Sequence, residues 1–131
     1  CLARGFVSSG LSDLMGQWLA SMTQMHLLTL IVVICTTVTF MTEATSNTAS
    51  TTLLMPVLAA AALASGLAPE IMMVPAAMSA SCAFMLPVAT APNSVVFGTG
   101  MITVQRMARE GVVLNLAGVL VISSVCYLFF K

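Results

Sequence analysis

Residues 42–52 read TEATSNTASTT and form a polar stretch between two uncharged apolar runs, residues 27–42 and 51–65. At 1.5 Å per helical residue each run measures roughly 22–24 Å, which is short for a hydrocarbon core about 30 Å thick. As one helix, the whole region would be about 58 Å long, with Glu43 near its middle. The sequence therefore predicts a re-entrant helical hairpin over residues 27–66, with its polar tip near residues 42–52 at membrane depth, lining a cavity.

A third short apolar run, residues 71–86, ends at two prolines, Pro87 and Pro92. Proline removes a backbone donor and biases the preceding residue away from helix, so a helix reaching Leu86 should break there. We expect it to resume after Asn93. The prediction is a discontinuous helix over residues 67–102, broken at 87–93, whose unwound part exposes the carbonyls of residues 88–90.

The remaining segments complete an all-α membrane protein. Residues 112–131 hold an uncharged apolar run long enough for one full transmembrane span, and residues 103–111 are predicted to form a separate surface helix. Within residues 1–26, the stretch 9–23 repeats apolar side chains at helical spacing and predicts an amphipathic interfacial helix. If Arg106 and Arg109 mark the cytoplasmic side of a plasma or inner membrane, the C-terminus lies outside.

Composition excludes several classes of protein. Of 131 residues, 60% are hydrophobic and 6% are charged, and the formal net charge is zero. Such a chain suits a lipid bilayer rather than water, and it offers no basic surface for nucleic acid. The first residue is Cys1 and not methionine, so we interpret the sequence as part of a longer protein. No nucleophile–base pair or metal-ligand spacing indicates an enzyme.

The polar tip and the break offer oxygen atoms rather than catalytic groups. Hydroxyls, an amide and freed carbonyls suit hard cations. No lysine or arginine lies in these segments. An anion bound there would need helix N-termini and a co-bound cation to balance its charge, which favours cation coupling.

Two motifs carry a resemblance to a known family. TEATSNTAS at residues 42–50 and FMLPVATAPN at residues 84–93 resemble the C-terminal half of the divalent anion/sodium symporter family, the INDY-type di- and tricarboxylate transporters. The resemblance implies half of an inverted-repeat elevator transporter that works as a homodimer. This chain would be the C-terminal part of the transport domain, completed by an N-terminal repeat and a scaffold, and the helix within residues 1–26 would be an arm that links the two domains. The implied activity is sodium-coupled symport of C4-dicarboxylates such as succinate or malate.

The resemblance also implies site residues, carried over by position. The residues implied to contact the substrate are Asn47, Thr48, Thr90 and Ala91. The residues implied to give oxygens to sodium are Thr42, Thr45, Asn47 and Ala89, with Thr42 and Thr45 acting partly through backbone carbonyls. The family usually reads Thr-Pro-Pro-Asn where this chain reads TAPN at residues 90–93, so a softer break is expected at Ala91.

Two other functions stay open at this point. The same fold would suit citrate or sulfate, because half of a site does not define the length or charge of the anion. An uncoupled membrane channel or a structural subunit, with the hairpin lining a pore, is the alternative from another class.

Overall fold

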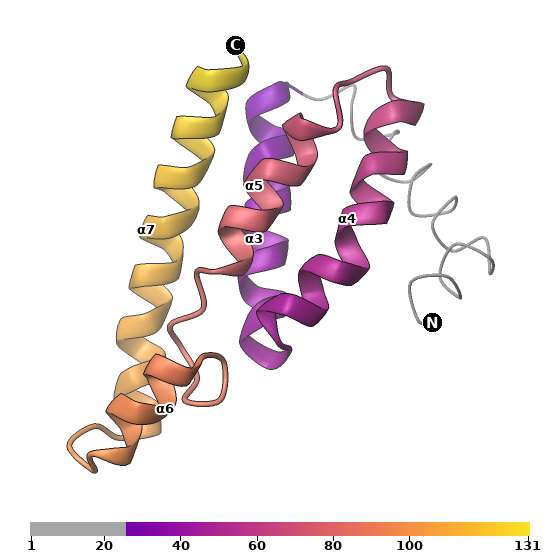
Figure 1. The fold of residues 1–131 in the computed structure, drawn as a ribbon. Coiled ribbons are helices and arrows are strands. Elements are labelled where there is room, and N and C mark those ends of the chain that lie inside the picture. The colour runs from indigo at the N-terminus through magenta and orange to yellow at the C-terminus, as the bar shows by residue number, and fades with distance from the viewer. Residues whose placement is uncertain (1–25) are drawn as a thin grey trace.

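The computed structural model describes residues 26–131, and this part of the chain consists of α-helices and their connections. The helices are α3 (Leu27–Ala44), α4 (Asn47–Ala64), α5 (Glu70–Ala80), α6 (Ala91–Gly98) and α7 (Val104–Phe130) (Figure 1). The all-α class is thus confirmed. The arm helix predicted within residues 1–26 lies outside the described residues, apart from His26.

Helices α3 and α4 form a hairpin with a much narrower tip than the sequence predicts. Only Thr45 and Ser46 separate the two helices, and each helix has 18 residues. The polar residues stay helical because their hydroxyls donate to carbonyls of the preceding turn: Thr51 to Asn47 at 2.9 Å and Thr52 to Thr48 at 2.7 Å. Both helices therefore extend beyond their charge-free runs. By length and composition, α3, α4 and α7 are each sufficient to cross a membrane.

The interruption of the next helix starts earlier than predicted. Helix α5 ends at Ala80 rather than at Leu86, and residues 81–90 are non-helical before α6 begins at Ala91. The expected boundaries of 87–93 are corrected accordingly. The cause is not proline alone, because side chains from α3 and α7 accept the backbone N–H groups of residues 84–86, which a continuing helix would use internally.

Helix α7 joins two segments that the sequence analysis separates. It runs without interruption over 27 residues, about 40 Å, and so includes both the expected surface helix at 103–111 and the expected span at 112–131. Thr103 caps its N-terminus by accepting the Arg106 N–H at 3.4 Å. Charged residues near its start do not end a helix, because arginine and glutamate are good helix formers.

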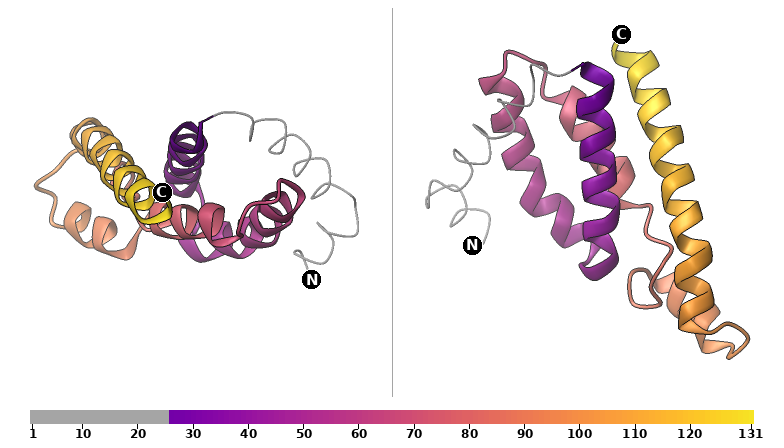
Figure 2. Two further views of the ribbon diagram at one scale, coloured as in Figure 1. Left: turned by 90° about the horizontal axis from the view of Figure 1, so that it is seen from above. Right: turned by 180° about the vertical axis from the view of Figure 1, so that it is seen from behind.

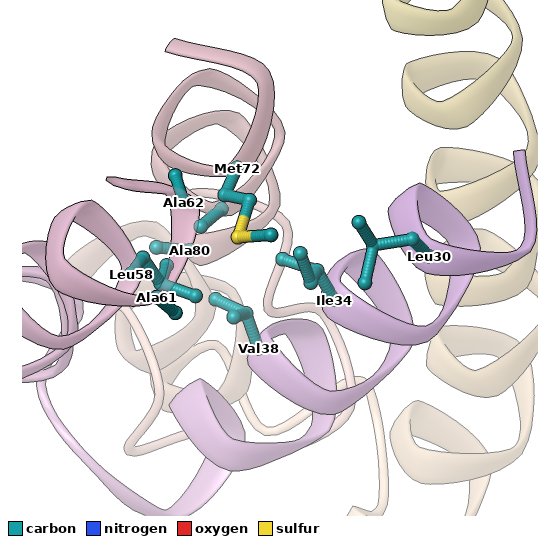
Figure 3. Close-up of a cluster of buried hydrophobic side chains, with 9 residues drawn as sticks. Leu30, Ile34, Val38, Leu58, Ala61, Ala62, Met72 and Ala80 are labelled. Atoms are coloured by element: carbon teal, nitrogen blue, oxygen red, sulfur yellow. The ribbon is translucent and has the colours of Figure 1, made fainter. Parts of the chain in front are cut away.

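The core has two parts, with α3 between them. One cluster is shared by α3, α4 and α5, and small residues on α4 and α5 let the helices approach closely (Figure 3). Its buried members are Leu30, Ile34, Val38, Leu58, Ala61, Ala62, Met72, Ala76 and Ala80. The second cluster joins α3 to α7 through Ile31, Cys35, Val119, Ile122 and Cys126. Helix α5 fills the space where α3 and α4 diverge from their tip (Figures 1 and 2).

The topology places the interrupted elements together. The start of α3, the end of α4, the start of α5 and the end of α7 lie at one end of the bundle (Figures 1 and 2). The hairpin tip and the non-helical segment lie side by side toward the other end, and α6 packs near the first turns of α7. The chain therefore brings two helix interruptions into one region.

Candidate functional site

A buried carboxylate links the hairpin to the break. Glu43 lies one residue before the end of α3 and is only 5% exposed. Its Oε1 accepts the N–H of Met85 at 3.0 Å, and its Oε2 accepts the N–H of Leu86 at 3.1 Å. Hydrogen bonds to a carboxylate are stronger than neutral ones, so this contact fixes the break against the end of α3.

Asn115 brings α7 into the same contact. Its Nδ2 donates to Glu43 Oε1 at 2.6 Å, and its Oδ1 accepts the N–H of Phe84 at 3.2 Å. The side chain is fully buried. Together, the side chains of Glu43 and Asn115 and the N–H groups of residues 84–86 form what we call the junction. It joins α3, the break and α7 through four hydrogen bonds.

Gly111, one turn before Asn115, lets α7 approach the break. A Cβ atom at this position would lie 2.5 Å from the carbonyl oxygen of Phe84 and 2.6 Å from the Cα of Met85. Real Cβ contacts of this length are essentially never seen. Only glycine therefore fits where α7 passes the backbone of the break.

The C-terminal side of the break is held by α6. Asn93 Nδ2 donates to the carbonyls of Ala83 at 2.8 Å and Leu86 at 3.0 Å, and Ser94 Oγ donates to the carbonyl of Pro87 at 2.6 Å. Within residues 26–131, no hydrogen bond is made to the carbonyl oxygens of Val88 and Ala89. These two oxygens are free to accept a ligand.

The hairpin tip also presents oxygen atoms. Asn47 Oδ1 is buried and has no hydrogen-bond partner in the described part of the chain. Thr45 Oγ1 lies 2.6 Å from Ser50 Oγ and donates to the carbonyl of Met41 at 2.9 Å. The N-cap residue Ser46 makes no side-chain capping bond, so the first N–H groups of α4 remain available. The tip thus offers an unpaired acceptor beside unpaired donors.

The structure gathers the site residues predicted from the sequence into two groups. Thr42, Thr45, Asn47 and Thr48 lie around the tip, and Ala89, Thr90 and Ala91 lie at the end of the break and the start of α6. Besides Thr45, two further hydroxyls are already engaged: Thr42 donates to the carbonyl of Thr39 at 2.9 Å, and Thr90 accepts the N–H of Asn93 at 3.3 Å. Within the described residues the carbonyl of Thr42 accepts no hydrogen bond, whereas the carbonyl of Thr90 accepts the N–H of Ser94 at 3.1 Å.

Sequence reasoning does not find the residues that hold the two groups together. It places Glu43 in the polar tip without a partner, and it gives no role to Asn93, Gly111 or Asn115. One signal was present, since an amide or carboxylate within an apolar segment is costly unless it is paired, and such residues usually pair with one another. Glu43 and Asn115 meet this description and are partners in the structure.

Charge is sparse around these oxygens. No lysine or arginine occurs between Arg4 and Arg106 in the sequence, and the nearest positive side chains to follow are on the first turns of α7. Among the described residues, an anion at the tip would meet the first backbone N–H groups of α4.

A helical hairpin packed with further apolar helices, with three of the described helices long enough to span a bilayer, defines an integral membrane protein. The chain belongs to the family described as the sodium:sulfate symporter transmembrane region, which matches residues 1–131. The resemblance found in the sequence is confirmed, and the family is one of transporters rather than enzymes.

Individual relatives agree with this assignment. The chain is 45% identical over 126 residues to the sodium-dependent dicarboxylate transporter SdcS of Staphylococcus saprophyticus. These 126 residues cover 24% of that protein and 96% of this chain. It is 43% identical over 126 residues, with the same coverage, to the protein of that name from Staphylococcus aureus. The chain therefore spans about a quarter of the length of the curated relatives it matches.

Proposed function

We propose that this chain is the C-terminal part of the transport domain of a sodium-coupled symporter for C4-dicarboxylates such as succinate or malate. The observation that carries the proposal is the buried, unpaired Oδ1 of Asn47 at the hairpin tip, next to a break with free carbonyls. The similarity to two sodium-dependent dicarboxylate transporters supports the choice of ion and substrate.

Sodium, as a co-transported substrate, is proposed to bind between the end of α3 and the break. A buried polar atom without a partner is unfavourable, and a hard cation with oxygen ligands would satisfy Asn47 Oδ1. The carbonyls of Thr42 and Thr45 lie at the C-terminal end of α3, where the helix dipole favours a cation. Ala89 would add its free carbonyl from the break.

The substrate carboxylate is proposed to bind at the N-terminus of α4. The free N–H groups there, with the side chains of Asn47 and Thr48, suit an anion. Thr90 and Ala91 would line the substrate from the break. With no cationic side chain in this region, the bound sodium offsets part of the negative charge. Each ligand would then bind better in the presence of the other, which is the basis of coupling.

The proposed architecture follows the family resemblance. The α3–α4 hairpin would be re-entrant, with its tip at membrane depth, and α5 and α6 would be the two parts of a discontinuous helix. An N-terminal repeat and a scaffold in the same polypeptide would complete an inverted-repeat elevator that forms a homodimer. Arg106 and Arg109 would mark the cytoplasmic side of the plasma or inner membrane. The C-terminus and the open end of the hairpin would then face outward.

The test is uptake of radiolabelled succinate into proteoliposomes that contain the full-length protein. Sodium or potassium is supplied outside, and unlabelled succinate, malate, citrate or sulfate is added in excess as competitor. We expect saturable, sodium-dependent uptake that malate inhibits strongly. If citrate or sulfate inhibits uptake most strongly, that anion is the substrate and the proposed sodium-coupled mechanism still holds. Sulfate is the first competitor to include, because the family's description names it. Unsaturable flux that ignores sodium would refute the symporter and favour a channel.

A further inference from the structure

The Asn115 side chain is the most unusual feature of α7. It is fully buried in a helix whose other inward-facing residues are glycine, serine or apolar, and both of its polar atoms are paired with other elements. Hydrogen bonds between helices are modest contributors to membrane-protein stability on average. The buried Asn115 amide has two hydrogen-bond partners, one of them a carboxylate. It therefore fixes where these partners lie relative to α7, because movement of either one would leave a buried polar group without its hydrogen bond.

The junction acts on the part of the break that precedes the proposed sodium ligand. Three consecutive N–H groups, those of residues 84–86, are bonded to Asn115 and Glu43. The N–H of Ala89 donates to the carbonyl of Leu86 at 3.1 Å, and Asn93 Nδ2 donates to the same carbonyl at 3.0 Å. The turn that carries the Ala89 carbonyl is therefore held between the junction on one side and α6 on the other.

We propose that Asn115 is a positioning residue for the sodium site. It holds the backbone of the break, directly at Phe84 and through Glu43, at a fixed place relative to the end of α3 that carries Thr42 and Thr45. This inference rests on the proposed sodium-coupled function. If the two segments that form the site are already correctly placed, less conformational entropy is lost when the ion binds. This preorganisation lowers the sodium concentration needed to half-saturate the site.

The experiment compares Asn115→Ala with Ser123→Ala in the full-length protein. Ser123 is the matched control, because it lies two turns further along α7, is also buried, and bonds only to carbonyls of its own helix, Val119 and Leu120. The measurement is sodium-dependent succinate uptake in proteoliposomes with equal amounts of protein. For Asn115→Ala we expect the half-saturating sodium concentration to rise at least about fivefold, a typical size for coupling between sites. The maximal rate at saturating sodium should change much less.

A pair exchange separates positioning from general damage to the fold. Asn115→Asp keeps the acceptor for the Phe84 N–H but places a second carboxylate against Glu43, so sodium affinity should fall. Glu43→Gln combined with Asn115→Asp restores a donor and an acceptor between the two side chains, although the new amide nitrogen then faces the N–H of Met85 and that backbone bond is lost. We expect the double variant to recover part of the sodium affinity lost in Asn115→Asp. An unchanged sodium dependence in Asn115→Ala overturns the proposal.

A readout without transport separates this inference from the proposed function. Cys82 lies at the start of the break and is half-buried. A loosened junction should expose its thiol, so Asn115→Ala should react with a maleimide several times faster at Cys82 than the unmodified protein or Ser123→Ala, as measured by peptide mass spectrometry. If the unmodified protein shows no sodium-dependent uptake, the proposed function fails, and unchanged labelling of Cys82 would then reject the junction's role as well. Normal uptake with unchanged sodium dependence and unchanged labelling rejects only the role of Asn115.

Discussion

Replacing Gly111 by alanine tests how closely α7 approaches the break. The added Cβ would lie 2.5 Å from the Phe84 oxygen, whereas ordinary contacts begin at 3.4 Å, so the break must move by about 1 Å. Such a shift would lengthen the 3.2 Å bond from Phe84 to Asn115 beyond the hydrogen-bonding range. Overpacking costs about 1–3 kcal/mol and each lost hydrogen bond about 1 kcal/mol, so we expect a loss of roughly 2–4 kcal/mol.

The assay is thermal unfolding of the full-length protein in detergent, together with sodium-dependent uptake in proteoliposomes. Gly118→Ala is the matched control on the same helix, because its Cβ would meet only the Cys82 side chain, at 3.5 Å. We expect Gly111→Ala to lower the unfolding temperature and to raise the sodium concentration needed for uptake. Gly118→Ala should leave both unchanged. Equal behaviour of the two variants would refute the close approach of α7 to the backbone of the break.

Three further predictions concern the proposed ligands. Asn47→Ala should abolish sodium-dependent succinate uptake while the protein still reaches the membrane; normal uptake would rule out Asn47 as a shared ligand. Sodium should raise the unfolding temperature of the unmodified protein, because an ion that binds only the folded state stabilises it. Potassium should give no such rise, and neither should sodium added to Asn47→Ala. Ala91→Pro should raise stability by about 0.5–1 kcal/mol, because proline suits the first position of a helix and restricts the unfolded chain. A marked loss of stability or uptake in that variant would show that the N–H of Ala91 is needed.

Much of the architecture was accessible from local patterns. Apolar runs of limited length around a polar stretch indicate a hairpin, and α3 and α4 form one in the structure. Two closely spaced prolines indicate a loss of helix, and the structure has a non-helical segment at residues 81–90 that includes the first of them. The lengths of the non-helical segments at the tip and at the break could not be predicted from local patterns. Threonine hydroxyls donate to carbonyls within α3 and α4, so a polar composition did not mean loss of helix.

The start of the break depends on residues far away in the chain. The N–H of Met85 bonds to Glu43, which is 42 positions earlier, and the N–H of Phe84 bonds to Asn115, which is 31 positions later. No pattern within the 81–90 segment reveals such partners. For the same reason, the family motifs indicate proposed ligands at the tip and the break but not the side chains that hold these two segments together.

The bond between Glu43 and Asn115 also has a consequence for biogenesis. The two residues are 72 positions apart, so at about 5–20 residues per second the carboxylate leaves the ribosome roughly 4–14 s before its amide partner. During this interval the end of α3 has a polar side chain without its later bonds, and exposure of that group to lipid would be costly. The bond that joins the end of α3 to α7 therefore forms only after Asn115 has been synthesised.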